Sequence, residues 1–87
     1  MESDDVIAAI KQILPSAEIH LEGADCNYTA LVISEAFTGK SPLQRELQIL
    51  GCFREELTSG TLHALTVRTF TPAEWAGRGQ HLVQLSL

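Results

Sequence analysis

Apolar residues recur every three or four positions near the start of the chain, the spacing of one face of a helix. They are Val6, Ile7, Ile10, Ile13 and Leu14. Ser3 is a candidate N-cap, and the acidic residues that follow it favour the positive end of a helix dipole. Pro15 cannot continue a helix. The pattern predicts a helix over residues 3–14.

Alternation with a period of two then predicts two strands joined by a turn. Ile19 and Leu21 alternate with polar residues, as in a strand with one face in water. Residues 23–27 (Gly-Ala-Asp-Cys-Asn) have the composition of a turn. Residues 28–33 are apolar enough to predict a central strand that is buried on both faces. Together these segments predict a β-hairpin.

The longest helical pattern begins at Ser41, the N-cap of a capping box with Gln44, and Pro42 takes the first helical position. Its apolar residues step by three or four, so we expect one buried stripe made of Leu43, Leu47, Leu50, Phe53 and Leu57. Gly51 costs ~1 kcal/mol relative to alanine inside a helix, which favours close packing at that point. Gly60 is the expected stop.

Residues 62–70 alternate again and predict a third strand, with Leu65 and Val67 on one face. A helix separates this strand from the second strand, so the two are expected to be parallel through a crossover connection.

A second capping box, Thr71 to Glu74, predicts a short last helix that ends at Gly77. Phe70 and Trp75 occupy the two positions of a hydrophobic staple around its start.

The expected order is therefore α-β-β-α-β-α, an α/β (α+β) domain over residues 1–77 with a three-stranded mixed sheet and its helices packed on one face. Residues 78–87 form a tail whose apolar end the pattern does not place. The tail's apolar residues are Leu82, Val83, Leu85 and Leu87.

Composition and charge limit the kind of protein and the partners that this sequence can have. At 87 residues and 45% hydrophobic content the chain suits one small globular domain. No apolar run approaches the ~20 residues of a membrane span, and the acidic start is unlike a secretory signal. We therefore expect a cytoplasmic protein with reduced cysteines. Six basic and eleven acidic residues give a net charge of −5, which disfavours nucleic acid and anionic membranes as partners.

Catalytic motifs are weak, so we expect a binding protein and not an enzyme. Residues 38–41 (Thr-Gly-Lys-Ser) look like the end of a phosphate-binding loop, but Ser34 stands where that motif needs a glycine. A capped helix start explains the segment better. The chain has no G-x-S-x-G elbow, and its cysteines and histidines have no zinc-type spacing. Cys52, beside the apolar stripe, is interpreted as a packed, inert thiol.

Two residues have open interpretations. His63, at the start of the third strand, lies where a ring nitrogen can reach solvent or a metal, or it is a half-buried histidine bonded to a backbone carbonyl. Cys26, in the hairpin turn, is a possible soft ligand or redox site, or an incidental turn residue. The order of the strands decides whether the two come together.

Three segments in this order and spacing resemble the BolA family, closest to its short IbaG-like bacterial branch. They are Phe37-x-Gly39-x-Ser41, Leu62-His63-Ala64-Leu65 and Phe70-Thr71-Pro72-Ala73-Glu74-Trp75. The resemblance covers about residues 3–77. It implies a class II KH-like fold, which agrees with the predicted order of elements.

The resemblance also implies a function. Members pair with monothiol glutaredoxins, share a bridging 2Fe–2S cluster in the heterodimer, and are linked to iron–sulfur trafficking, iron and stress regulation and, in some cases, transcription. In that pattern His63 is one cluster ligand. Cys26, in the loop between the first two strands, is the second, with His20 in reserve. Alone, the chain is expected to be a monomer or weak homodimer without a cluster. The alternative is a DNA-binding regulator that uses the KH-like surface.

Overall fold

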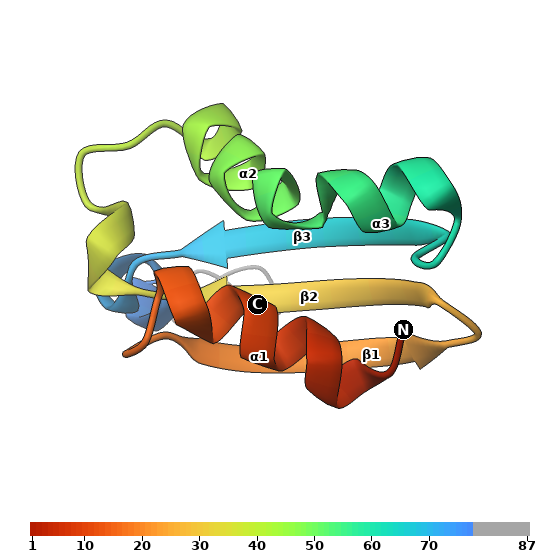
Figure 1. Cartoon of the computed structure of the whole chain (residues 1–87). Helices are drawn as coiled ribbons and strands as arrows, with labels where there is room; N and C mark the ends of the chain where they lie inside the picture. Colours follow the sequence, from red (N-terminus) through yellow and green to blue (C-terminus); the bar gives the residue numbers. More distant parts are fainter. Residues whose placement is uncertain (78–87) are drawn as a thin grey trace, which may run out of the picture.

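The computed structural model describes residues 1–77, which form a three-stranded sheet with helices packed against it (Figure 1). Strands β1 (Glu18–Ala24) and β2 (Asn27–Ile33) are antiparallel, and β3 (Ala64–Phe70) runs parallel to β2. The strand order is β1-β2-β3, so β2 is central. The parallel pair predicted from the intervening helix is confirmed.

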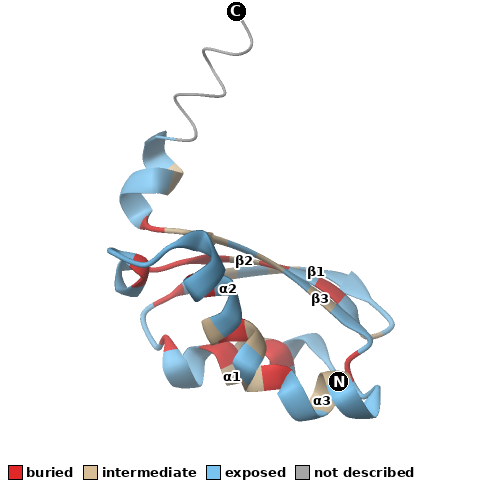
Figure 2. Cartoon of the chain, turned by 90° about the horizontal axis from the view of Figure 1, so that it is seen from above, coloured by how far each residue is buried: buried red, intermediate tan, exposed pale blue. Residues whose placement is uncertain are grey.

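The helices lie on one face of this sheet (Figure 2). They are α1 (Ser3–Ile13), α2 (Pro42–Leu50) and α3 (Arg54–Ser59), with short 3₁₀ turns η1 (Glu35–Phe37) and η2 (Gly51–Phe53). A last helix over residues 72–77 stands beyond the end of the sheet (Figure 2). The predicted order is confirmed, with the second helix in two pieces. The predicted tail, residues 78–87, lies outside the described residues. Within residues 1–77 no helix has the length and apolar character needed to span a bilayer.

The core lies between the helices and the inner face of the sheet. Val6 and Ile10 of α1 are fully buried, as the helical spacing predicts. Each such side chain contributes about 1.5–3 kcal/mol by leaving water. The other fully buried side chains are Ala30, Val32, Phe37, Ile49, Phe53 and Leu62.

The start of α1 differs by one residue from the prediction. Glu2 is the N-cap and Ser3 is the first helical residue. The carboxylate of Asp5 accepts the backbone N–H of Glu2 at 3.1 Å. This bond satisfies the backbone N–H of the N-cap residue itself.

The predicted burial of the central strand on both faces is wrong. Tyr28, Ala30 and Val32 are buried, whereas Thr29 is exposed and Leu31 is half-buried. The reason is that all three helices along the sheet cover the same face, which leaves the outer face of β2 open to solvent.

The predicted apolar stripe of the second helix is also partly wrong. Leu43 and Leu47 are 63% and 59% exposed. The buried positions are Arg45 and Ile49 in α2 and Phe53 after it. Leu43 and Leu47 are exposed because the face of α2 that packs on the core is the one that bears Arg45 and Ile49. The predicted single helix is also interrupted at Gly51 by the 3₁₀ turn η2.

Close packing at Gly51 is not observed. A Cβ atom added there would meet no heavy atom within 4 Å. The glycine therefore makes room for no neighbour.

Arg45 is buried because its charge has partners. Its Nη1 and Nη2 donate to the two carboxylate oxygens of Glu74 at 2.6 and 3.1 Å, and its Nε donates to the carbonyl of Lys40 at 3.0 Å. The guanidinium also lies 5.6 Å from the centre of the Phe37 ring. This bidentate pair attaches the last helix to α2.

The second capping box and the hydrophobic staple are confirmed. Thr71 Oγ1 accepts the N–H of Glu74 at 3.1 Å, and Glu74 Oε1 accepts the N–H of Thr71 at 2.9 Å. The rings of Phe70 and Trp75 meet edge to face, with centroids 5.3 Å apart. Ser41 and Gln44 exchange equivalent bonds at the start of α2, so the first predicted box is confirmed too.

The Glu74 carboxylate makes stability depend on pH. Its hydrogen bond from Arg45, and then the one from the Thr71 backbone, lower its pKa to about 2 from an ordinary value of 4.5. A depressed pKa stabilises the folded state above the ordinary value, and this stabilisation is lost as pH falls toward 2. We expect Glu74→Gln to be less stable than the parent above pH 5, with a difference in melting temperature that shrinks between pH 4.5 and pH 2.

Glu55→Gln, which removes an exposed carboxylate of α3, is the matched control. A difference between Glu74→Gln and the parent that stayed constant down to pH 2 would contradict the assignment.

Candidate metal site

The turn between β1 and β2 is a two-residue hairpin loop made of Asp25 and Cys26. Both have positive φ, 56° and 64°, which is the requirement of a type I′ turn. Ala24 and Asn27 close the turn as a strand pair. Aspartate accepts this backbone region more readily than most residues, whereas cysteine does not. Cys26 therefore occupies a strained backbone conformation.

Cys26 and His63 lie side by side, because β2 and β3 are parallel and in register from Asn27 and Ala64 onward. The carbonyl of Cys26 accepts the N–H of His63 at 2.8 Å and that of Ala64 at 3.1 Å. His63 is exposed and Cys26 is half-buried. The structure thus brings together two residues that are 37 positions apart in the chain.

The loop before β3 is held in place from both sides of His63. Gly60 ends α3 with φ of 87°, the left-handed conformation predicted for the helix stop. Leu62, which follows it, is fully buried in the core. A glycine turn and an apolar anchor therefore fix the backbone from which His63 projects.

Met1 packs over the Cys26 thiol. The Met1 amine lies 3.5 Å from Cys26 Sγ and 3.3 Å from the Thr61 carbonyl, and the Tyr28 hydroxyl donates to the Met1 carbonyl at 2.9 Å. In Figure 1 the first residue, the β1–β2 turn and the start of β3 lie at the same end of the sheet. Burial, followed by the negative charge of a Cys26 thiolate, raises the pKa of Tyr28. Sequence patterns missed Met1 and Tyr28, because their proximity depends on how α1 packs.

His20 is not part of this group. It lies on β1 opposite Leu31, and its Nε2 is 2.5 Å from Glu18 Oε2. Four residues of β1 separate it from the turn, or about 13 Å at strand spacing. The residue held in reserve is therefore remote from both Cys26 and His63.

Cys52 is a packed thiol and residues 38–41 are a capped helix start, as the sequence predicted. Burial raises the pKa of the Cys52 thiol, whose Sγ is 3.7 Å from the Gln48 carbonyl. Ser41 caps α2, and Lys40 Nζ donates to Gln48 Oε1 at 3.0 Å. The segment is a capped helix start, as expected.

This chain offers two metal ligands at the site, Cys26 and His63. Across residues 1–77 no group of three or more histidine, cysteine, aspartate or glutamate side chains is placed to hold a metal ion. Thiolate and imidazole are both suitable ligands for iron, so Cys26 and His63 fit a mixed iron–sulfur site that other ligands complete.

Comparison with known proteins places the chain in a family. The model of the BolA family, described as BolA-like protein, matches residues 6–74. The acid stress protein IbaG of Escherichia coli K12 is 26% identical over 76 residues, which cover 87% of this chain and 90% of IbaG.

Two solved structures share the fold and some sequence. The BolA domain of SufE1 from Arabidopsis thaliana is 28% identical with a TM-score of 0.72, over 85% of this chain and 98% of that one. Yeast Fra2 is 25% identical with a TM-score of 0.66, over 86% and 84% of the two chains. The class that the fold and its matches define is the BolA-like α/β domain. This chain belongs to the BolA family.

The strained turn generates a prediction about stability. Glycine accepts positive φ freely, whereas a side chain branched at Cβ does not, and left-handed backbone costs roughly 1–2 kcal/mol. We expect Cys26→Val to be less stable than the parent, and Cys26→Gly to be more stable than the Val variant by about 1–2 kcal/mol in urea unfolding. Thr29→Val, on the exposed face of β2, is the control and should leave stability nearly unchanged. Equal stability of the Gly and Val variants would show that the turn is not strained at Cys26.

Proposed function

We propose that this chain pairs with a monothiol glutaredoxin and shares with it a bridging 2Fe–2S cluster, to which Cys26 contributes a thiolate and His63 a neutral imidazole. The observation that carries the proposal is that the Cys26 carbonyl accepts the backbone N–H groups of His63 and Ala64, which places the backbones of Cys26 and His63 next to each other. Membership of the BolA family supports it, since this pairing is what the family resemblance implies.

The need for a partner follows from the number of ligands. A 2Fe–2S cluster takes four protein or thiol ligands, and this site supplies two. The described residues contain no third histidine, cysteine or acidic side chain grouped with them. The remaining ligands then come from the glutaredoxin side, which makes the cluster a bridge between two proteins.

The mixed donor set suits a cluster that is passed on. Replacing a thiolate by an imidazole raises the reduction potential of the cluster. A neutral imidazole is also held less strongly by iron than a thiolate is, so we expect His63 to dissociate before the cysteine ligands as pH falls. In this account the chain acts as an adaptor in iron–sulfur trafficking or iron and stress regulation in the reducing cytosol, and performs no catalysis of its own.

DNA binding has less support. The charge of Arg45, one of the described cations, is already paired with the Glu74 carboxylate. The net charge of −5 opposes a phosphate backbone, and Pro42 replaces the second glycine of a KH-type G-x-x-G loop.

Substitution of the two donors tests the proposal. A complex of this chain with cluster-bearing monothiol glutaredoxin should show visible absorption and circular dichroism distinct from the glutaredoxin alone. We expect His63→Ala to abolish that distinct spectrum, because the imidazole ligand is lost. Cys26→Ser should shift the spectrum or shorten the lifetime of the cluster, because an oxygen donor is harder than a thiolate.

His20→Ala is the matched control, since it removes a histidine that the structure places away from the site, and its complex should match the parent. A His63→Ala complex with the parent's spectrum would refute the ligand assignment, and His63 would then be a strand-end histidine without a metal role.

A further inference from the structure

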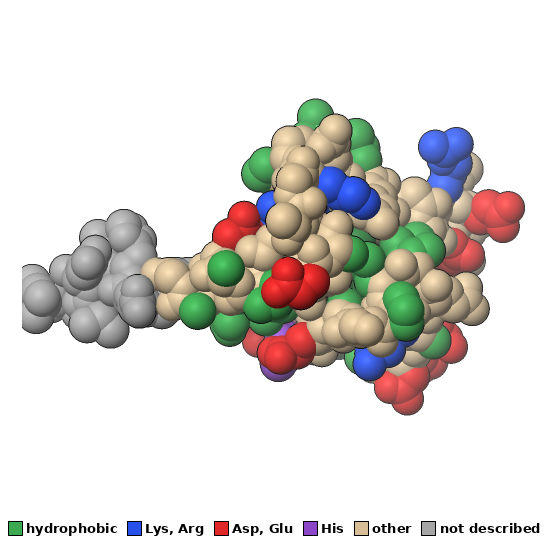
Figure 3. Space-filling model, turned by 90° about the vertical axis from the view of Figure 1, so that its left-hand side faces the viewer, with side chains coloured by type: hydrophobic (Ala, Val, Ile, Leu, Met, Phe, Trp, Pro, Cys, Tyr) green, Lys and Arg blue, Asp and Glu red, His purple; other side chains and the backbone are tan. Residues whose placement is uncertain are grey.

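The outer side of α2 and α3 carries leucines that the core does not use. Leu43 and Leu47, one turn apart on α2, are 63% and 59% exposed. Figure 3 shows hydrophobic side chains at the top of the molecule, where α2 lies in Figure 1. A shallow groove of about 440 Å³ continues this surface onto α3. We call Leu43 and the groove the leucine surface; the groove is lined by Leu47, Leu50, Gly51, Arg54, Leu57 and Thr58.

Gly51 lies in the middle of the leucine surface and has no role within the chain. Its φ of −59° and ψ of −25° are helical values that any residue adopts. A Cβ atom there would meet no heavy atom within 4 Å, so no neighbour requires a glycine. Alanine would be better by ~1 kcal/mol in a helix. The glycine therefore leaves a gap in the row of side chains, which an apolar side chain from another molecule can enter.

Two opposite charges lie on either side of this gap. Glu46 precedes Gly51 by five residues and Arg54 follows it by three, and both are exposed. Within residues 1–77 neither of them forms an ion pair. Eight helical positions separate the two by about 12 Å, which is too far for them to pair within one chain. An occupant of the leucine surface thus needs apolar side chains, an acidic group and a basic group.

The leucine surface itself has this composition, so a second copy of the chain fits it. A two-fold axis between residues 50 and 51 sets two copies antiparallel, with residues at equal distances from the axis opposite each other. Leu50 then enters the gap above Gly51 of the second copy. Leu47 covers the aliphatic part of the opposite Arg54 side chain, whose guanidinium extends toward Glu46 beside that leucine. Each contact occurs twice, because the axis repeats it.

We propose that α2 and α3 form a two-fold homodimer surface, in which Leu50 packs over Gly51 of the second copy and Arg54 pairs with the second copy's Glu46. The surface is smaller than the roughly 20–30 residues per partner of a standard interface, so the dimer is weak and reversible. The inference does not depend on the proposed function, because it uses neither Cys26 nor His63.

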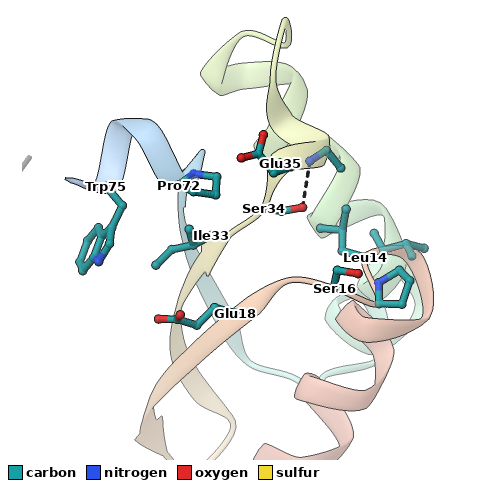
Figure 4. Close-up of a pocket in the computed structure, with 11 residues that line it drawn as sticks. Leu14, Ser16, Glu18, Ile33, Ser34, Glu35, Pro72 and Trp75 are labelled. Atoms are coloured by element: carbon teal, nitrogen blue, oxygen red, sulfur yellow. Dashed lines mark hydrogen bonds between the residues drawn. The ribbon is translucent and has the colours of Figure 1, made fainter. Parts of the chain in front are cut away.

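Analytical ultracentrifugation of the full chain, with a reductant present to exclude disulfides, tests the inference. The average mass should rise from one chain toward two between ~10 µM and ~1 mM protein, the range that suits a small interface. Leu47→Lys should weaken the dimer by about tenfold or more, because it places an unpaired charge opposite Arg54. Ile13→Lys is the matched control, since Ile13 is 40% exposed but lines a separate cleft with Ile33 and Trp75 (Figure 4).

Charge reversal tests the pairing itself. Glu46→Arg and Arg54→Glu should each weaken the dimer several-fold, and the double variant should recover the parent's affinity, because the two charges are exchanged. Gly51→Gln should abolish the dimer by filling the gap, while the melting temperature of the dilute monomer stays at or above that of the parent.

A parent that stays monomeric at the highest concentration would overturn the proposal. So would a dimer that Leu47→Lys leaves unchanged, or a double variant that binds no tighter than its single variants. Neither iron nor glutaredoxin is present in these measurements, so their result stands whether or not the proposed function is correct.

Discussion

The parallel pairing of β2 with β3 is the constraint on which the candidate site depends. A parallel pair needs a crossover connection, which α2, η2 and α3 supply on the helical face of the sheet. Its register ends with one carbonyl, that of Cys26, accepting two N–H groups from the start of β3. A shift of one residue would move every side chain of β3 to the other face, so the buried side chains of the core also hold Cys26 against His63. The site is thus a consequence of core packing, although neither donor belongs to the core.

Local patterns in the sequence were sufficient to predict most of the helices, strands and turns of the fold. Capping boxes at Ser41 and Thr71, the alternation of β1 and β3, and Gly60 as a helix stop each depend on neighbours within a few residues, and each is confirmed. Arg45 is a residue whose burial local patterns could not predict. The predicted stripe did not include Arg45, because its partner Glu74, which makes burial of the charge favourable, is 29 positions away in the chain. Leu43 and Leu47 are exposed as a result, because the face that bears Arg45 is the one directed at the core.

The candidate site also has a part that the sequence predicted and a part that it did not. The residue types and the family resemblance pointed to Cys26 and His63, but their proximity follows from strand register, which no local pattern specifies. Register also separates His20 from the site by about four strand positions, or about 13 Å. The Met1 and Tyr28 contacts with the turn had no signal in the sequence, since they arise from the way α1 lies across the sheet. Cys26 itself is in a backbone conformation that favours glycine, which is a cost in stability that a role for its thiol would explain.

The most direct measurement of the central claim is pulsed electron paramagnetic resonance on the reduced 2Fe–2S complex, formed with this chain carrying ¹⁵N-labelled histidine and with an unlabelled glutaredoxin. If His63 binds iron, a nitrogen coupling changes from the ¹⁴N to the ¹⁵N pattern on labelling. The coupling then disappears in His63→Ala and remains in His20→Ala. A spectrum that is the same with labelled and unlabelled chain would mean that no histidine of this protein binds the cluster.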